Sequence, residues 1–293
     1  MHVDAGTITL LLVAFFAAIV NGALGYGFSS LAIPIALLFY TNKTLAPAFV
    51  AIEMVINFYV VIMNRHGLRA VAKRVMPIVL GLIPGIIIGS TMLSSGHPDW
   101  LKFFTYVVIL PLILLQAGGF RRPIRAERKV AVPLGVGVGI LYSTTTISGP
   151  PLAIMLNNQG LAKEEFRAAV GLVRVAETTM TAIAYSFLGL FARESAGVLS
   201  YLVPGIVLGL PIGAFIIRRI NTETFRRICM SFDAWIVGFG LSRVAIELRL
   251  LPNPLAYSIM LVVALIDAYL LYYYFFVRKK GVYSASVQSD TAV

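Results

Sequence analysis

The feature that most restricts the fold of this chain is a helix-breaking stretch in the middle of a long uncharged run. Residues 130–162 carry no charge and are numerous enough to enter a lipid bilayer. Their centre, residues 142–151, reads YSTTTISGPP, in which hydroxyls compete for backbone hydrogen bonds and Gly149 with two prolines breaks a helix. Backbone cannot lie open to lipid, so such a break needs protein or a water-filled cavity around it. Because transporters bind substrates at broken membrane helices, residues 142–151 are one half of a candidate binding site.

The composition is typical of an α-helical membrane protein. Of 293 residues, 59% are hydrophobic and 13% are charged, which is too little polar sequence to cover a soluble domain. We therefore predict an all-α polytopic membrane protein with the lipid bilayer as its surroundings. The single cysteine, Cys229, excludes an internal disulfide. The net charge of +11 is expected to set the orientation in the membrane, and without a nucleic-acid-binding motif we expect no nucleic-acid partner.

Two uncharged stretches begin two halves of similar order. Residues 5–42 carry no charge. This stretch is too long for one membrane span and slightly short for two. Their middle, residues 21–30, reads NGALGYGFSS. We predict a re-entrant-like hairpin of two short helices at residues 5–42 and a second broken hairpin at residues 131–157. Three spans follow each hairpin and one extra span ends the chain, at residues 45–64, 75–95, 101–119, 168–190, 197–217, 228–246 and 255–277.

The Lys and Arg residues lie mostly on one side of these predicted spans. Of 24, four lie on the opposite side, and Arg174 and Arg243 lie within spans. The other 18 lie in five basic or mixed-charge segments, at residues 65–74, 121–129, 163–167, 218–227 and 278–280. Because cytoplasmic loops are enriched in Lys and Arg, we predict a multi-pass protein of the cell membrane. Its N-terminus is expected outside and its C-terminus in the cytoplasm.

The two halves are predicted to be inverted repeats. An odd number of crossings in the first half turns the second upside down. Residues 22–35 align with residues 139–152, and two helices carry glycines at every fourth position, a spacing that lets another backbone approach closely. These glycines are Gly81, Gly85 and Gly89 in the first half and Gly205, Gly209 and Gly213 in the second. The predicted parts are a first repeat at residues 1–129, a second at 130–247, an extra helix at 248–280 and a flexible tail at 281–293.

The glycine-rich element at residues 22–34 and the SGPP element at residues 148–151, placed early in two similar halves, resemble the TauE/SafE family. This family is also called the sulfite exporter or TSUP family. The resemblance covers residues 7–277. It implies export or import of sulfur-containing anions such as sulfite, organosulfonates and thiosulfate, and some members are linked to other organic acids.

Two hairpins that enter from opposite faces are expected to meet near the midplane. A helix N-terminus there offers unpaired N–H groups and a partial positive charge, and neighbouring hydroxyls add donors, which suits an anion. The alternative is that these polar residues only satisfy backbone groups freed by the breaks. The predicted substrate-binding residues are Gly25, Tyr26, Gly27, Ser29, Ser30, Thr144, Thr145, Thr146, Ser148, Gly149, Pro150 and Arg174.

Ionisable side chains inside spans are costly and are candidates for function. Arg174 is expected either to attract the anion or to pair with a carboxylate, and the alternative is a side chain that reaches to the headgroups. Glu53 and Glu177 are candidate proton carriers, and Asn57 joins them because it aligns with Glu177. For these the alternative is a buried polar bridge between helices. Asp233 and Asp267 receive no role.

The sequence therefore predicts a secondary transporter, specifically an exporter, of small sulfur-containing anions such as sulfite or organosulfonates. It would work by alternating access, and small-residue faces permit a homodimer. A transporter of other small organic acids and an uncoupled anion channel stay open as alternatives. An intramembrane enzyme would need a nucleophile motif and a membrane histidine, but His2, His66 and His97 fall at the terminus or in turns. We therefore expect no enzyme, no cofactor and no metal site.

Overall fold

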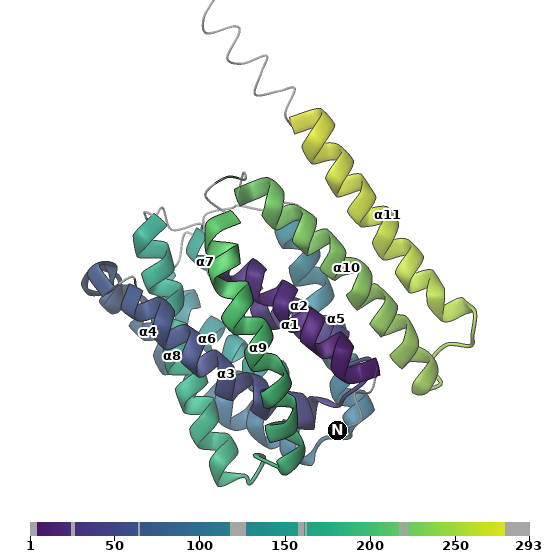
Figure 1. Cartoon of the computed structure of the whole chain (residues 1–293), viewed down its shortest axis with the longest axis horizontal. Helices are drawn as coiled ribbons and strands as arrows, with labels where there is room; N and C mark the ends of the chain where they lie inside the picture. The colour runs from purple at the N-terminus through teal and green to yellow at the C-terminus, as the bar shows by residue number, and fades with distance from the viewer. Residues whose placement is uncertain are drawn as a thin grey trace, which may run out of the picture.

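The computed structural model describes the chain as a bundle of helices (Figure 1). The described residues are 5–24, 27–63, 65–117, 127–157, 161, 163–216, 219 and 222–278. The main helices are α1 (Ala5–Leu24), α2 (Phe28–Ala36), α3 (Asn42–Met63), α4 (Leu68–Ser95), α5 (Pro98–Ala117), α6 (Glu127–Thr145), α7 (Gly149–Asn157), α8 (Lys163–Phe187), α9 (Arg193–Ile216), α10 (Thr222–Glu247) and α11 (Ser258–Tyr272). Three short helices, η1 (Arg65–Gly67), η2 (Leu255–Tyr257) and η3 (Tyr273–Arg278), complete the described part.

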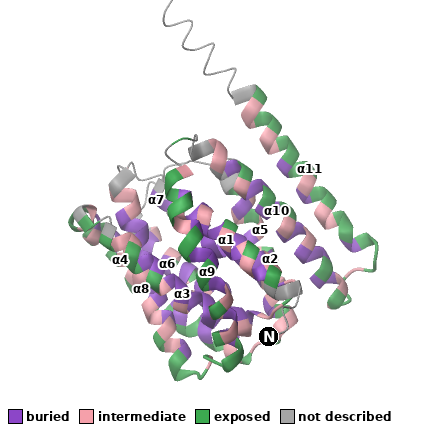
Figure 2. Cartoon of the chain, viewed as in Figure 1, coloured by how far each residue is buried: buried purple, intermediate pink, exposed green. Residues whose placement is uncertain are grey.

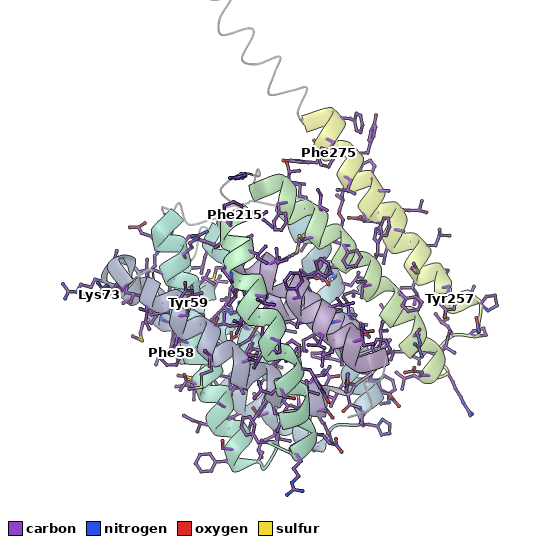
Figure 3. All side chains as sticks on the ribbon, viewed as in Figure 1. Phe58, Tyr59, Lys73, Phe215, Tyr257 and Phe275 are labelled. Carbon is purple, nitrogen blue, oxygen red and sulfur yellow. The ribbon has the colours of Figure 1, made fainter. Side chains whose placement is uncertain are left out.

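The predicted all-α membrane class is confirmed. Within the described ranges there is no strand. Six helices are long and apolar enough to cross a membrane, namely α3, α4, α5, α9, α10 and α11. The outer faces of the bundle carry large apolar side chains (Figure 3), of which Phe215, for example, is 55% exposed. Such a surface suits lipid, while the buried residues gather inside the bundle (Figure 2).

Both predicted helix breaks are present, but the helices around them differ from the prediction. α2 and α7 have nine residues each, whereas α1 has 20 and α6 has 19, so only the second helix of each hairpin is short. The first break ends at Gly27, whose φ of 103° is accessible to glycine. The second break includes Thr146, with a φ of 57°.

The second break lies just before the residues that were expected to cause it. α7 begins at Gly149, and the two prolines fall in its first turn, where a missing N–H costs little. The helix instead ends at Thr145, whose hydroxyl accepts the backbone N–H of Ile147 at 3.1 Å and donates to the carbonyl of Leu141 at 2.6 Å. Thr145 thus ends α6, and α7 begins at Gly149 with the two prolines next in its first turn.

The spaced glycines explain why α1 and α6 are long. On α4, a Cβ added at Gly85 would overlap the carbonyl oxygen of Val136 on α6, and Gly81 and Gly89 also face α6. On α9, a Cβ at Gly209 would lie 2.6 Å from the carbonyl oxygen of Phe15 on α1. The expected packing role of these glycines is confirmed. Because α4 and α9 accept a neighbouring backbone over three turns, α6 and α1 are held along most of their length.

α3 and α8 pack against each other, and each also contacts one of the glycine-paired helices. α8 packs against α3 and α4, and α3 packs against α8 and α9. α8 does not count among the six apolar spans because it carries charged residues in its first turn and at Arg174 and Glu177. The charged helix is therefore covered by apolar ones, which is where polar groups are tolerated in a membrane.

Each of the five predicted basic segments contains helical residues. Arg69, Lys73 and Arg74 lie in the first two turns of α4, and Lys163 begins α8. Arg227, expected in a loop, is 1% exposed on α10, and its guanidinium lies 3.6 Å from the ring centre of Tyr274. Long basic side chains can lie at the membrane surface while their backbone is already helical. The predicted loop residues 121–126 and the tail at 281–293 fall outside the described residues.

The extra helix α11 is attached to α10 by a polar contact. Asp267 is buried, and its two oxygens accept hydrogen bonds from Ser231 at 2.8 Å and from the indole N–H of Trp235 at 2.9 Å. Only 17% of the most apolar stretch within Leu255–Phe276, which contains this helix, is buried. Because apolar contact adds little when lipid is the alternative, this contact is expected to hold α11 in place.

Replacing Asp267 by alanine is therefore expected to loosen α11. Two donors on α10 would lose their acceptor, at a cost of about 1–3 kcal/mol. Hydrogen–deuterium exchange in nanodiscs should show faster exchange across residues 258–272. Leu265→Ala, at a side chain 63% exposed on the same helix, serves as the control. Equal protection of α11 in Asp267→Ala and in the wild type would contradict this role.

Candidate functional site

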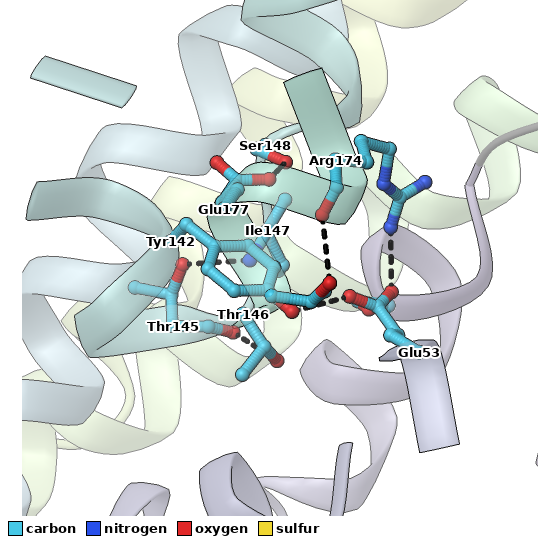
Figure 4. A network of polar contacts seen from close by, with 10 residues as sticks. Glu53, Tyr142, Thr145, Thr146, Ile147, Ser148, Arg174 and Glu177 are labelled. Atoms are coloured by element: carbon cyan, nitrogen blue, oxygen red, sulfur yellow. Dashed lines mark hydrogen bonds and ion pairs between the residues drawn. The ribbon is translucent and has the colours of Figure 1, made fainter. Parts of the chain in front are cut away.

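A buried carboxylate on α3 joins both helix breaks to α8. Glu53 is completely buried, and it accepts hydrogen bonds from Ser29 at the start of α2 and from the hydroxyl of Tyr142 on α6, the latter at 2.9 Å (Figure 4). Nη2 of Arg174 on α8 lies 2.7 Å from the same carboxylate. Four helices thus place one polar side chain each at this point, which lies near the middle of α3 and of α8.

The second break reaches the same part of α8. Glu177, three residues after Arg174 and therefore on the same helix face, accepts a hydrogen bond of 2.6 Å from Ser148. Ser148 lies between α6 and α7. Arg174 and Glu177 are 2% and 0% exposed. The break residues Ser29 and Ser148 are thus each bound to a carboxylate of the α3–α8 pair.

Arg174 does not reach to the headgroups. Its side chain is buried and pairs with a carboxylate, which was one of the two predicted arrangements. Two of its nitrogens, Nε and Nη1, have no hydrogen-bond partner among the described residues. Nδ2 of Asn57 and Oε1 of Glu177 are also buried without a partner there. Buried polar atoms are nearly always satisfied, so these unpaired N–H groups are available to a further hydrogen-bond acceptor.

The threonine hydroxyls are directed to the backbone. Thr144 donates to the carbonyl of Ile140 at 2.8 Å, Thr145 donates to that of Leu141, and Thr146 donates to that of Thr145 at 2.8 Å. Ile140 and Leu141 lie inside α6, so the first two bonds return to helix carbonyls, as Ser and Thr hydroxyls often do. Only the third reaches a carbonyl that the end of the helix leaves free. A hydroxyl has one proton to donate, so direct donation from these threonines to a substrate stays a prediction.

The remaining predicted residues have varied positions. Gly27 precedes α2 with its left-handed backbone, and Ser30 is buried in the first turn of α2. Gly149 and Pro150 begin α7, where Pro150 and Pro151 supply no N–H, so this N-terminus offers fewer donors than an ordinary one. Gly25 and Tyr26 lie outside the described residues.

Three polar residues that support the second break were not singled out from the sequence. The amide of Asn42 donates to the hydroxyl of Thr105 at 3.0 Å and to the carbonyl of Thr144 at 3.2 Å. The hydroxyl of Tyr185 donates to the carbonyl of Ser143 at 2.6 Å. These bonds satisfy carbonyls at the C-terminal end of α6, which lack a partner within the helix. Asn42 ends the first uncharged run, and this position is the one sequence signal that could have marked it as a candidate.

An apolar groove of about 870 Å³ runs beside this site. It is lined by α1, α3 and α9 and by Arg167 near the start of α8. It includes Ile52 and Ile56, on either side of Glu53 in the sequence, and Asn21 is a second polar member. Glu53 and Arg174 do not line it. The ion pair is therefore enclosed by protein in this conformation. Within the described ranges, no group of three His, Cys, Asp or Glu side chains could hold a metal ion.

The family model described as sulfite exporter TauE/SafE matches residues 10–240. The match includes both breaks, the α3–α8 pair and most of α10, and it ends before α11. No curated protein and no solved structure matches this chain.

Proposed function

This chain belongs to the TauE/SafE sulfite exporter family, and we propose that it is a secondary transporter that exports small sulfur-containing anions such as sulfite or organosulfonates. As a family member with six apolar helices, it is a multi-pass membrane protein. We place it in the cell membrane with the N-terminus outside, because 18 of its 24 Lys and Arg residues lie on one side of the predicted spans.

The unpaired N–H groups of Arg174 carry this proposal. Nε and Nη1 are buried without a partner while Nη2 is bound to Glu53. A guanidinium offers a planar set of donors that matches two oxygens of one anion. Sulfite and sulfonates present several oxygens on one sulfur atom. Nε and Nη1 lie on different edges of the guanidinium and each shares its edge with Nη2, which keeps a second N–H. The anion would bind with two oxygens to that N–H and to one of the two unpaired nitrogens, between the two helix breaks.

Glu53 would keep this binding reversible. A positive charge with no carboxylate partner in a closed site would hold an anion too tightly for transport. Conduction and release require moderate affinity. The carboxylate 2.7 Å from Nη2 offsets part of that charge. It also connects Arg174 to Ser29 and Tyr142, so a change at Arg174 reaches both hairpins.

The helix pairing supports alternating access by two repeats. α1 of the first predicted repeat packs against α9 of the second, and α6 of the second packs against α4 of the first. Each repeat thus contributes the long helix of its hairpin to the other, as a repeat arrangement predicts. In our proposal these two helix pairs move relative to the α3–α8 pair and expose the anion to one side at a time. The repeat boundaries and a homodimer stay predictions.

Transport by purified protein in liposomes tests this function. We expect saturable uptake of radiolabelled sulfite or an organosulfonate, faster when unlabelled anion is present on the opposite side, because a carrier exchanges substrate. A channel would show flux without this stimulation, and faster flux of carboxylates than of sulfur anions would indicate an organic-acid transporter. Absence of flux for every anion would overturn the proposal.

Arg174→Lys tests the binding site within the same assay. Lysine keeps the positive charge but has no planar set of donors. We expect the half-saturating concentration to rise by about tenfold or more, which corresponds to about 1.4 kcal/mol. Arg243→Lys, at a side chain 46% exposed, should leave it unchanged. An unaltered half-saturating concentration in folded Arg174→Lys would exclude binding at this guanidinium.

A further inference from the structure

A second buried carboxyl lies on α10, outside the site around Glu53. The side chain of Asp233 is completely buried, and neither of its oxygens has a hydrogen-bond partner among the described residues. α10 packs against α5 and α11 and also contacts α2 and α1 (Figure 1). Asp267 on α11, by comparison, has both oxygens satisfied.

The helices on the inner side of α10 have no charged residue near Asp233. α1 and α2 contain no charged residue. On α5, Asp99 and Lys102 lie in the first two turns, and the buried Tyr106 donates its hydroxyl to the carbonyl of Pro34 at 2.9 Å. Tyr106 faces Gly240, two turns of α10 after Asp233.

The other polar and ionisable residues described on α11 and on α10 itself have other contacts or lie at the surface. Asp267 is bound to two residues of α10, and Tyr269, Tyr272 and Tyr257 are exposed. Cys229 lies one turn before Asp233. The charged residues of α10 with described side chains are otherwise Arg227, which lies against Tyr274, and the half-exposed pair Arg243 and Glu247.

An ionised Asp233 would therefore have no donor or cation among the residues that the structure describes. Burying an unpaired carboxylate costs several kcal/mol or more, far above the cost of a neutral carboxyl. A metal cation is not a suitable partner, because Na⁺-like or Ca²⁺-like ions need several oxygen ligands and the flanking Met230, Ala234 and Val237 belong to the apolar core. The remaining ligand is a proton.

We infer that Asp233 is the binding site of a proton that is exchanged during the transport cycle. α10 packs against α2, whose first turn carries Ser29, so movement of the first hairpin changes the covering of α10. When water reaches Asp233, its O–H bond breaks and the proton passes to water on that side. The carboxylate then takes a proton from water on the other side before the apolar covering closes again. This inference rests on the proposed transport function and adds the coupling ion.

Gradient-driven flux and exchange separate this role from a structural one. In liposomes with radiolabelled sulfite or an organosulfonate, a pH gradient should accelerate wild-type flux, and pyranine trapped inside should report proton movement. Asp233→Asn imitates the neutral carboxyl. In this variant the acceleration by the pH gradient should be smaller by tenfold or more, while anion exchange at equal pH should be retained. Glu247→Gln, an exposed carboxyl on the same helix, should behave as the wild type. Acceleration retained in Asp233→Asn, or lost only in Glu177→Gln, would overturn the inference.

Chemical labelling tests the proton independently of transport. A lipid-soluble carbodiimide reacts with protonated carboxyls in apolar surroundings. Mass spectrometry of the intact reconstituted protein should find Asp233 labelled at neutral pH and labelled less as the pH rises. No labelling of Asp233 between pH 6 and pH 8 would overturn the inference even if Asp233→Asn failed to fold. Labelling of Asp233 in a protein that moves no anion would refute the proposed transport function instead.

Discussion

Replacement of Arg174 by alanine is expected to destabilise the protein by about 3–5 kcal/mol. Glu53 would keep its burial and lose the guanidinium 2.7 Å away. Ser29 and Tyr142 would still donate to it, but two hydroxyls offset only part of the cost of a buried charge. The free energy of unfolding in mixed detergent micelles measures this effect. Transport by this variant should be abolished.

A double-mutant cycle shows that the effect comes from the charge pair. Glu53→Gln leaves a buried cation and should also be destabilising, whereas Arg174→Ala with Glu53→Gln removes both charges. We expect the double variant to be about 2–3 kcal/mol more stable than the sum of the single effects predicts. Arg243→Ala breaks a half-exposed contact of 3.7 Å with Glu247 and should cost less than about 1 kcal/mol. Additive effects at Arg174 and Glu53 would show that the two side chains do not depend on each other.

The two helix breaks could be predicted from sequence because their signal is local. Glycine at residue 27 and the Ser, Thr and Pro residues near residue 149 change backbone preferences within a few positions. The same local reasoning placed the second break a few residues late, since prolines are tolerated in the first turn of α7. Which residue ends a helix depends on the hydrogen bonds it finds, and those of Thr145 are set by the fold.

The partners of the ionisable residues could not be predicted in this way. The sequence indicated that Glu53, Arg174 and Glu177 were unusual, because charges inside spans are costly. It did not show that Glu53 and Arg174 would form a pair across 121 positions, nor that Tyr142 and Ser29 would join them. Such contacts follow from the crossing of α3 and α8. That Asp233 has no partner in the described part of the chain is equally a result of the fold, since its sequence neighbours give no indication of it.

The close pairing of α4 with α6 and of α1 with α9 leads to the second large effect. We expect Gly85→Ala and Gly209→Ala each to destabilise the protein by about 1–3 kcal/mol, and by more in combination. At Gly85 the added methyl group would meet three backbone atoms of Val136, and at Gly209 it would lie 2.6 Å from the carbonyl oxygen of Phe15. Backbone cannot rotate away as a side chain can, so the two helices would have to separate.

The same helices and their partners supply matched controls for this effect. Gly197 on α9 and Gly137 on α6 have open space where a Cβ would lie. Alanine at these positions should leave the free energy of unfolding unchanged or raise it by up to about 1 kcal/mol, since alanine is the better helix former. Because lipid tails compete equally for apolar faces, close backbone contact is the main force available to hold α1 and α6 in the bundle. Equal effects at Gly209 and Gly197 in mixed-micelle unfolding would show that the bundle does not depend on these glycine contacts, and the long first helices of both hairpins would need another explanation.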